Sequence, residues 1–188
     1  MAFDAYMRFL EPKVEGEAKL SANYQTDSAD GNSGWIDISD YGFSATMAVT
    51  PARSGGTGAA TTGKGKLEPF NCKKRADATS MSLAFHAAAG TIFKRIVVNL
   101  FATLDEGGAK HKPHQFLTVV LQGAVISAYK FSGSAGDDLP EEEISITYGS
   151  IEYKYNGFSV DEETGAITPG GKKSVFSWST IKNSGSKA

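Results

Sequence analysis

Apolar and polar side chains alternate along residues 41–47, and this alternation limits the fold more than any other feature of the sequence. Tyr41, Phe43, Ala45 and Met47 are separated by small or polar residues. Because successive side chains of a β-strand point to opposite faces, a period of two indicates a strand with one buried face. Further strand candidates lie at residues 5–10, 35–38, 66–73, 92–102, 115–129, 141–155 and 174–181.

The strand candidate at 141–155 changes phase in its middle. Its large apolar residues occupy even positions within 144–148 and odd positions within 151–155. A phase change at Gly149 predicts a β-bulge, which lets a strand turn a corner without losing its pattern.

Helical spacing is found in one segment. The predicted helix runs from about Asp77, which can accept hydrogen bonds at a helix start, to residue 89, and Gly90 stops it. Its expected apolar face, laid on a sheet or barrel end, consists of Met81, Ala84, Phe85 and Ala88. Roughly eight to ten strands and one short flanking helix predict an all-β fold, either a closed or nearly closed antiparallel barrel or a two-sheet sandwich.

The length of 188 residues favours a single domain spanning 1–188. Residues 49–65 contain five glycines and hardly any anchoring side chain, which predicts an extended loop that a partner would order. The polar tail from Lys182 is expected to fray.

Charge and hydropathy exclude several classes of partner. The formal net charge of −2 leaves no positive field for a phosphate backbone, so nucleic acid is not expected. No apolar run is long enough to span a bilayer, so membrane insertion is not expected. Asp4 and Arg8 interrupt the N-terminal apolar stretch, so we expect no cleavable signal peptide. The single Cys72 forms no intrachain disulfide and is expected in the core.

No constellation predicts an enzyme, a metal site or a cofactor. His111 and His114 lack the further ligands that a metal centre needs. The run Glu141 to Glu143 points its side chains alternately to two faces and cannot converge on one atom. The glycines before Lys66 resemble a phosphate-binding loop, but a strand follows them where such a loop needs a helix.

Two charged runs of opposite sign suggest self-association. A basic run can meet an acidic run on a second copy and produce a head-to-tail contact that closes a ring or extends a filament. The candidate contact charges are Lys73, Lys74, Arg75, Asp137, Asp138 and Glu141.

Several stretches together resemble the hemolysin-coregulated protein (Hcp) family, the inner-tube subunit of bacterial type VI secretion systems. The resemblance covers nearly the whole chain and depends on the order and spacing of its motifs. These are MAFDAYMRF at the start, Val14–Glu17, Trp35–Ile38, Tyr41–Phe43, Gly63–Lys66, Lys74–Thr79, Ser132–Asp137, Glu143–Tyr148 and Tyr153–Tyr155.

The resemblance implies a β-barrel with a flanking helix, rings of six copies around a wide channel, and stacking of rings into a tube. The tube would be loaded in the cytoplasm and fired outward by a sheath, with spike and baseplate proteins as partners and effector proteins as cargo. Residues 49–65 would reach a neighbouring ring through Pro51, Arg53, Thr57, Thr61 and Lys64. Gly42 would face the lumen.

Two other function classes stay open at this point. A monomeric β-sandwich ligand-binding module would need an exposed aromatic platform or a polar pocket, for which Tyr24 and Trp35 are the candidates. A hydrolase would need a nucleophile, a base and an orienting group that the fold brings together from distant strands.

Overall fold

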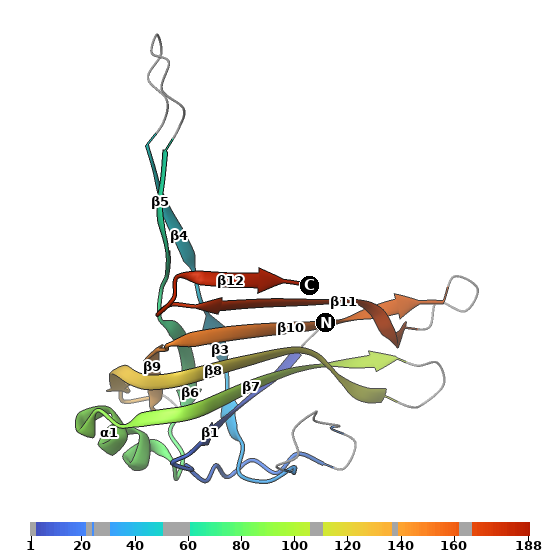
Figure 1. The fold of residues 1–188 in the computed structure, drawn as a ribbon. Helices are drawn as coiled ribbons and strands as arrows, with labels where there is room; N and C mark the ends of the chain where they lie inside the picture. The colour runs from blue at the N-terminus through green and yellow to red at the C-terminus, as the bar shows by residue number, and fades with distance from the viewer. Residues whose placement is uncertain are drawn as a thin grey trace.

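The chain folds almost entirely into antiparallel strands with one short helix (Figure 1). The computed structural model describes residues 3–21, 24, 31–50, 61–105, 111–136, 139–161 and 167–188. The strands are β1 (Phe3–Leu10), β2 (Ile36–Ile38), β3 (Asp40–Gly42), β4 (Ala45–Thr50), β5 (Thr61–Leu67), β6 (Phe70–Arg75), β7 (Ile92–Asp105), β8 (His111–Ser132), β9 (Glu141–Thr147), β10 (Ser150–Val160), β11 (Ile167–Ser179) and β12 (Ser184–Lys187). The helix α1 spans Ser80–Ala89. The all-β prediction with one short helix is confirmed.

The main sheet branches at β8. One path has the order β12-β11-β10-β8-β7-β1-β2, and β8 also pairs with β9, which pairs with β6, which pairs with β3. Residues 117–122 of β8 pair with β10, and residues 125–132 pair with β9. Between these stretches Gly123 has φ +56°, a left-handed conformation that glycine adopts without strain. The bend at Gly123 therefore lets one strand serve both arms of the sheet.

The phase change near Gly149 is a corner between two strands, so the predicted β-bulge is wrong. Strand β9 ends at Thr147 and β10 begins at Ser150. The Gly149 amide donates to the carbonyl oxygen of Gln122 at 2.9 Å, at the bend of β8. The flip in the apolar pattern marks the point where the chain passes from one half of β8 to the other.

The two arms of the sheet approach each other at β2 and β3. Strand β2 pairs with β1 and β3 pairs with β6, and only Ser39 separates them. The Ser39 amide donates to the carbonyl oxygen of Lys73 at 2.8 Å. The ladders among the described residues form a branched sheet and do not establish a closed barrel, which stays a prediction.

Apolar side chains are buried on both faces of the β1–β7 region. The larger cluster includes Met7, Phe9 and Cys72. Cys72 therefore lies in the core, as predicted, and burial raises the pKa of its thiol to about 12. A smaller cluster on the other face contains Leu20, Trp35, Val97 and Phe101. Part of the 11–35 segment covers this second face, where Ala18 and Trp35 form an isolated bridge (Figure 1). Trp35 is fully buried and offers no ligand platform.

Helix α1 is shorter and rotated relative to its prediction. It begins at Ser80 rather than Asp77 and ends, as expected, at Gly90 in the left-handed conformation. Met81 and Phe85 are 68% and 67% exposed, so the predicted apolar face is wrong. Ser80 hydrogen-bonds to the buried Glu142, and its carbonyl oxygen accepts from the Tyr129 hydroxyl. These polar anchors turn Leu83 toward the core instead.

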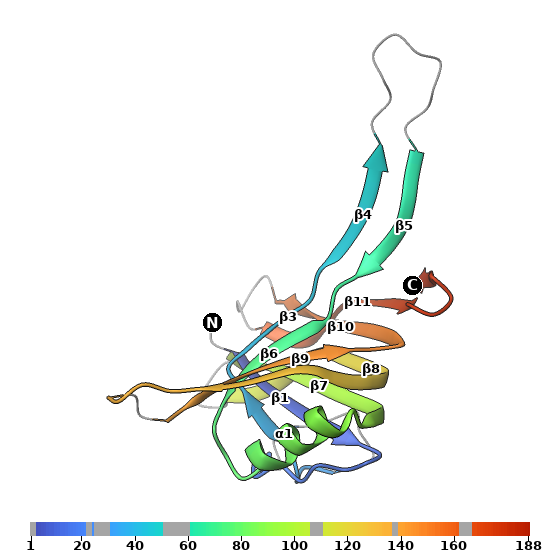
Figure 2. The same cartoon turned by 90° about the vertical axis from the view of Figure 1, so that its left-hand side faces the viewer.

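Residues described within 49–65 belong to a β-hairpin, so the prediction of an extended loop without anchors is corrected. Strands β4 and β5 pair from Ala45↔Leu67 to Thr50↔Thr61. The hairpin projects away from the rest of the molecule (Figure 2). The tail is corrected too, because β12 pairs with β11 and the Ala188 amide donates to the Val175 carbonyl oxygen at 2.9 Å.

Candidate assembly surfaces

The β4–β5 hairpin is the first candidate surface for contact with other molecules. Its two strands pair only with each other, as a separate two-stranded sheet. A two-stranded hairpin alone is marginally stable in water and leaves backbone donors and acceptors free along both edges. Met47 and Val49 on β4 are 52% and 56% exposed. The projecting β4–β5 hairpin thus combines unpaired strand edges with exposed apolar side chains.

The predicted stacking residues are divided between β5 and the part of the chain outside the described residues. Lys64 lies on β5 and is exposed, and Thr61 is the first residue of the same strand. Pro51, Arg53 and Thr57 lie outside the described residues.

The predicted contact charges meet within one chain. In the β6–β9 ladder, Lys73 is opposite Glu143, Lys74 is opposite Glu142, and Arg75 is opposite Glu141. Strands that pair in this register place the basic run and the acidic run side by side, which the sequence could not reveal without the pairing. Asp137 and Asp138 lie outside the described residues.

Lys74 is fully buried and is therefore not a surface charge. Its Nζ atom lies 3.2 Å from Glu142 Oε1 and 2.9 Å from Asp77 Oδ1, and it donates to the Arg75 carbonyl oxygen at 2.8 Å. Glu142 is fully buried as well. Because a side chain without exposed surface has nothing to offer a neighbouring subunit, Lys74 does not fit the predicted role. The network instead joins β6, β9 and the start of α1.

Lys73 keeps a partly exposed position between two carboxylates. Its Nζ atom lies 3.5 Å from both Glu141 Oε2 and Glu143 Oε1, and Lys130 Nζ approaches Glu143 at 3.5 Å. The nearby carboxylates, Glu141 first, raise the pKa of Lys73. Exposed pairs of this kind contribute little to stability and can exchange partners.

Gly42 ends β3 beside an aromatic contact. A side chain at Gly42 would have open space around it, and Gly42 is opposite Asn71 on β6. The next residue, Phe43, packs on Tyr153 with ring centroids 4.5 Å apart. Gly42 therefore lies at the end of the β3–β6 pair, between the main sheet and the hairpin.

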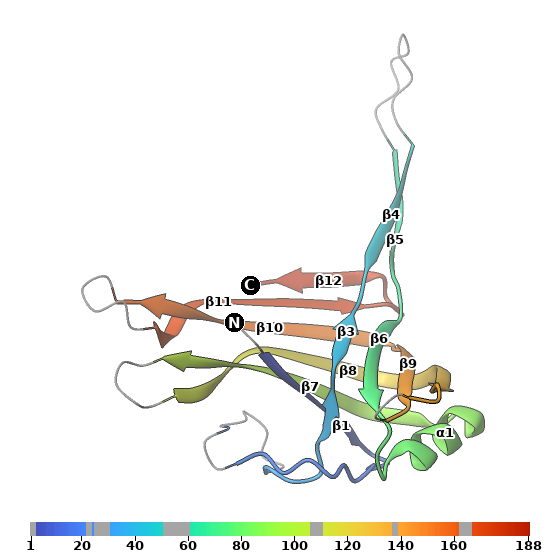
Figure 3. The same cartoon turned by 180° about the vertical axis from the view of Figure 1, so that it is seen from behind.

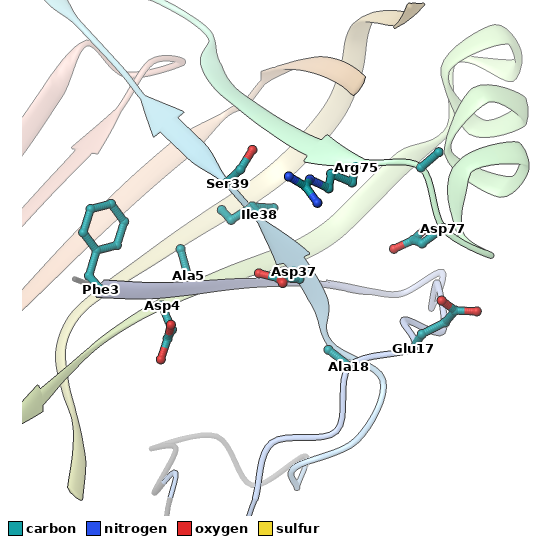
Figure 4. Close-up of a pocket in the computed structure, with 11 residues that line it drawn as sticks. Phe3, Asp4, Ala5, Glu17, Ala18, Asp37, Ile38, Ser39, Arg75 and Asp77 are labelled. Atoms are coloured by element: carbon teal, nitrogen blue, oxygen red, sulfur yellow. The ribbon is translucent and has the colours of Figure 1, made fainter. Parts of the chain in front are cut away.

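A groove of about 800 Å³ lies where β2 turns away from β6 (Figure 4). Its walls come from residues 3–5 on β1, residues 17–18, residues 37–39 and residues 75–77. Asp37 and Asp77 stand near Arg75 at one end of the groove (Figure 4). Burial and the Asp4 charge raise the pKa of Asp37.

The groove is the main feature that the sequence did not predict. Its four walls are far apart in sequence, and no sequence pattern indicates that they meet to form a binding surface. The pairing of β2 with β1 in place of β6 creates it.

Of the two histidines at 111 and 114, His114 packs against an aromatic ring of β10. The ring centroids of His114 and Phe158 are 5.2 Å apart, and burial lowers the pKa of His114. His111 begins the same strand, β8. Within the described part of the chain, no three His, Cys, Asp or Glu side chains gather as metal ligands would. Among the same residues, no helix has the length and hydropathy to cross a membrane.

One protein family matches the sequence of this chain, and several solved structures share its fold. A sequence profile described as "Type VI secretion system effector, Hcp" matches residues 14–155. A solved structure described as that of a type six secretion system protein is 25% identical, with a TM-score of 0.71 over 98% of this chain and 100% of its own. Hcp1 from Salmonella typhimurium is 13% identical, with a TM-score of 0.61 over 98% and 99%. A baseplate structure of the anti-feeding prophage is 14% identical, with a TM-score of 0.50 over 81% and 93%. No curated protein matches.

Proposed function

Because the chain belongs to the Hcp family of the type VI secretion system, we propose that it is the repeating subunit of a secretion tube. The family is one of structural, secreted proteins rather than enzymes. In the proposed tube six copies close into a ring, rings stack, and effector proteins travel in the lumen. The match over residues 14–155 is the observation that carries this proposal.

The exposed apolar side chains support self-assembly. Met81 and Phe85 on α1, Ile92 at the start of β7, and Met47 on the hairpin are all more than half exposed. Two of the four lie on α1, and apolar side chains that gather on one exposed face mark sites of interaction with other proteins. We propose that copies of the same chain cover these side chains in the tube.

Three parts of the chain take separate roles in the proposed tube. They are the hairpin, the strand that carries Gly42, and the charged residues of the β6–β9 pair with Asp137 and Asp138. The hairpin and its tip, including Pro51, Arg53, Thr57, Thr61 and Lys64, contact the neighbouring ring. Residues 36–42 close the branched sheet into a barrel, and Gly42 faces the lumen. Lys73, Arg75, Asp137, Asp138 and Glu141 contribute charges at contacts between subunits, where Lys73 can exchange its partners within the chain for partners on a neighbour.

The route out of the cell follows from the same proposal. The chain is loaded in the cytoplasm and leaves inside the contracting machine. Sheath, spike and baseplate proteins are its partners, and the fold it shares with a baseplate structure is consistent with this assignment.

The mass of the purified chain in solution tests the proposal. Light scattering coupled to size exclusion should give about 119 kDa, the mass of six copies of the 19.9 kDa chain. High salt should reduce this mass if charged contacts contribute, because salt screens exposed pairs. A mass of 19.9 kDa at every concentration would contradict the ring and favour the monomeric binding module.

A further inference from the structure

One antiparallel ribbon runs through the molecule from the hairpin to the groove. Strands β2, β3 and β4 follow one another along one side of it, and β5 and β6 return along the other (Figure 3). Strand β3 pairs with β6 and β4 with β5. The ribbon projects as the hairpin at one end. At the other end β2 leaves β6 to pair with β1, and the groove lies at this separation.

We propose that the groove between residues 37–39 and 75–77 receives the β4–β5 hairpin of a second copy of this chain. The proposal rests on the tube-subunit function proposed above and names the acceptor for its stacking contact. The donor and the acceptor occupy opposite ends of one ribbon. A copy displaced along the ribbon axis therefore brings its hairpin toward the groove of the next copy, a head-to-tail contact that repeats without limit.

Charge is complementary between the two ends. Residues 45–67 contain three basic side chains and no Asp or Glu. The groove walls carry four carboxylates, from Asp4, Glu17, Asp37 and Asp77, and one guanidinium, from Arg75. Opposite potentials on two surfaces favour their encounter and fix their register.

Lys64 is the best placed donor on the hairpin. It is exposed on β5, and it forms no ion pair with any other described residue. Lys66, by contrast, lies 3.0 Å from Glu68 of its own chain. On the acceptor side, Asp77 is held by Lys74, and Asp4 accepts from the Tyr24 hydroxyl. Asp37 and Glu17 form no ion pair with another described residue, and Asp37 lies next to Ile38 on the apolar wall of the groove, so we assign the contact to Lys64 and Asp37.

The apolar parts of the two surfaces match as well. Phe3, Ala5 and Ile38 line the groove, and Phe3 is 48% exposed. The hairpin offers Met47 and Val49. Burying these side chains together would stabilise a ribbon that is marginal alone.

The raised pKa of Asp37 is consistent with a carboxyl group at which a cation from a second copy could bind. Partial desolvation at the groove wall raises the pKa of this exposed side chain most, Asp4 and Asp77 add to the effect, and Arg75 opposes it. A lysine that docks beside Asp37 would favour the ionised carboxylate and lower this pKa. Docking should therefore weaken as the pH falls through the pKa of Asp37.

Cysteine cross-linking tests the contact whether or not rings form. The chain carrying both Lys64→Cys and Asp37→Cys should give a ladder of disulfide-linked multimers under mild oxidation, because the two sites lie at opposite ends of each copy. The native Cys72 is buried and should not compete. The matched control pairs Lys64→Cys with Ser186→Cys on the exposed strand β12, and it should give no ladder. A ladder from the control equal to that of the test variant, or none from the test variant, would overturn the proposal.

Charge reversal supplies a second readout. Lys64→Glu alone and Asp37→Lys alone should each lower the fraction of protein that sediments as stacked particles by about tenfold, since like charges then face each other. The double variant should restore it. Light scattering on the same samples reports ring formation, so failure of the tube proposal appears as loss of the ring mass. Failure of the docking proposal appears as single variants that sediment like the wild type, or a double variant that stays dispersed.

Discussion

Lys74 shows how the meaning of one residue depends on its strand partners. In the sequence it belongs to a basic run, but in the fold it is enclosed with Glu142 and Asp77. Burying two charges costs free energy that only good geometry and further hydrogen bonds offset. Removing one member of the network should therefore lower the free energy of unfolding strongly.

Lys74→Met should lower the free energy of unfolding by about 3–5 kcal/mol, because it leaves the Glu142 carboxylate buried without its cation. The neighbouring Lys73→Met, which removes a partly exposed lysine from the same strand, should change the free energy of unfolding by less than about 1 kcal/mol. Urea titrations of both variants measure the difference. Equal effects for the two lysines would contradict the buried network, and combining Lys74→Met with Glu142→Leu should recover most of the loss.

Asp77 links stability to acid pH. Burial raises its pKa, but hydrogen bonds from Thr79 and Lys74 outweigh burial and hold the pKa below 3.8. Since the folded pKa is lower than the unfolded one, the stability that ionised Asp77 supplies is complete above pH 3.8. It is lost as the pH falls through the folded value.

Asp77→Asn should therefore destabilise the protein at pH 7 by about 1.5–3 kcal/mol, and the difference from the wild type should shrink below pH 3.8. Unfolding by urea between pH 7 and pH 3 checks this. The exposed Asp40→Asn serves as the control and should show neither effect. A constant gap between Asp77→Asn and the wild type over the whole range would contradict this assignment.

The sequence predicted the position of helix α1 along the chain but not which of its faces is buried. Its apolar spacing favoured the face with Met81 and Phe85, yet Leu83 is buried instead. Helical periodicity gives the relative positions of side chains, but polar anchors elsewhere decide which face turns inward. Here Ser80 contacts Glu142, from a strand more than sixty positions away in sequence.

Replacing both Met81 and Phe85 by Ser should change the free energy of unfolding of the dilute chain by no more than about 0.5 kcal/mol per site. Leu83→Ala, on the buried face of the same helix, should cost about 2–5 kcal/mol. Urea titrations at low protein concentration compare them. A large loss from the exposed pair would mean that the helix is rotated from the orientation described.

The hairpin is separable from the fold. Among the side chains described between 45 and 67 none is buried, and Leu67 at the end of β5 is partly buried against the core. Replacing residues 49–62 by a two-residue Asn-Gly turn should leave the unfolding free energy within about 1 kcal/mol of the wild type. The ring mass by light scattering should persist while sedimentation of stacked particles disappears. A shortened chain that still stacks would remove the hairpin from the contact between rings.

At the scale of the whole molecule, local patterns predicted the elements and missed their pairing. Alternation located the strands, and Gly90 marked the end of α1. The partners of each strand depend on contacts between distant segments, so the groove and the buried Lys74 could not be foreseen. Glycine content made residues 49–65 look like a free loop, although cross-strand pairing extends the hairpin to Thr50 and Thr61.

The tube-subunit account also makes a claim about shape. A chain that closes rings should expose its hairpin at one ring face and its groove at the other, since the two lie at opposite ends of one ribbon. Rings built this way present unlike faces and stack in one direction.

Electron microscopy of the purified wild-type chain, with particles sorted into class averages, tests this account most directly. The account predicts rings of six subunits around an open centre, with side views of rings stacked face to back. Compact particles without a central opening at every concentration would contradict it. The chain would then share the fold of the Hcp family without forming its rings.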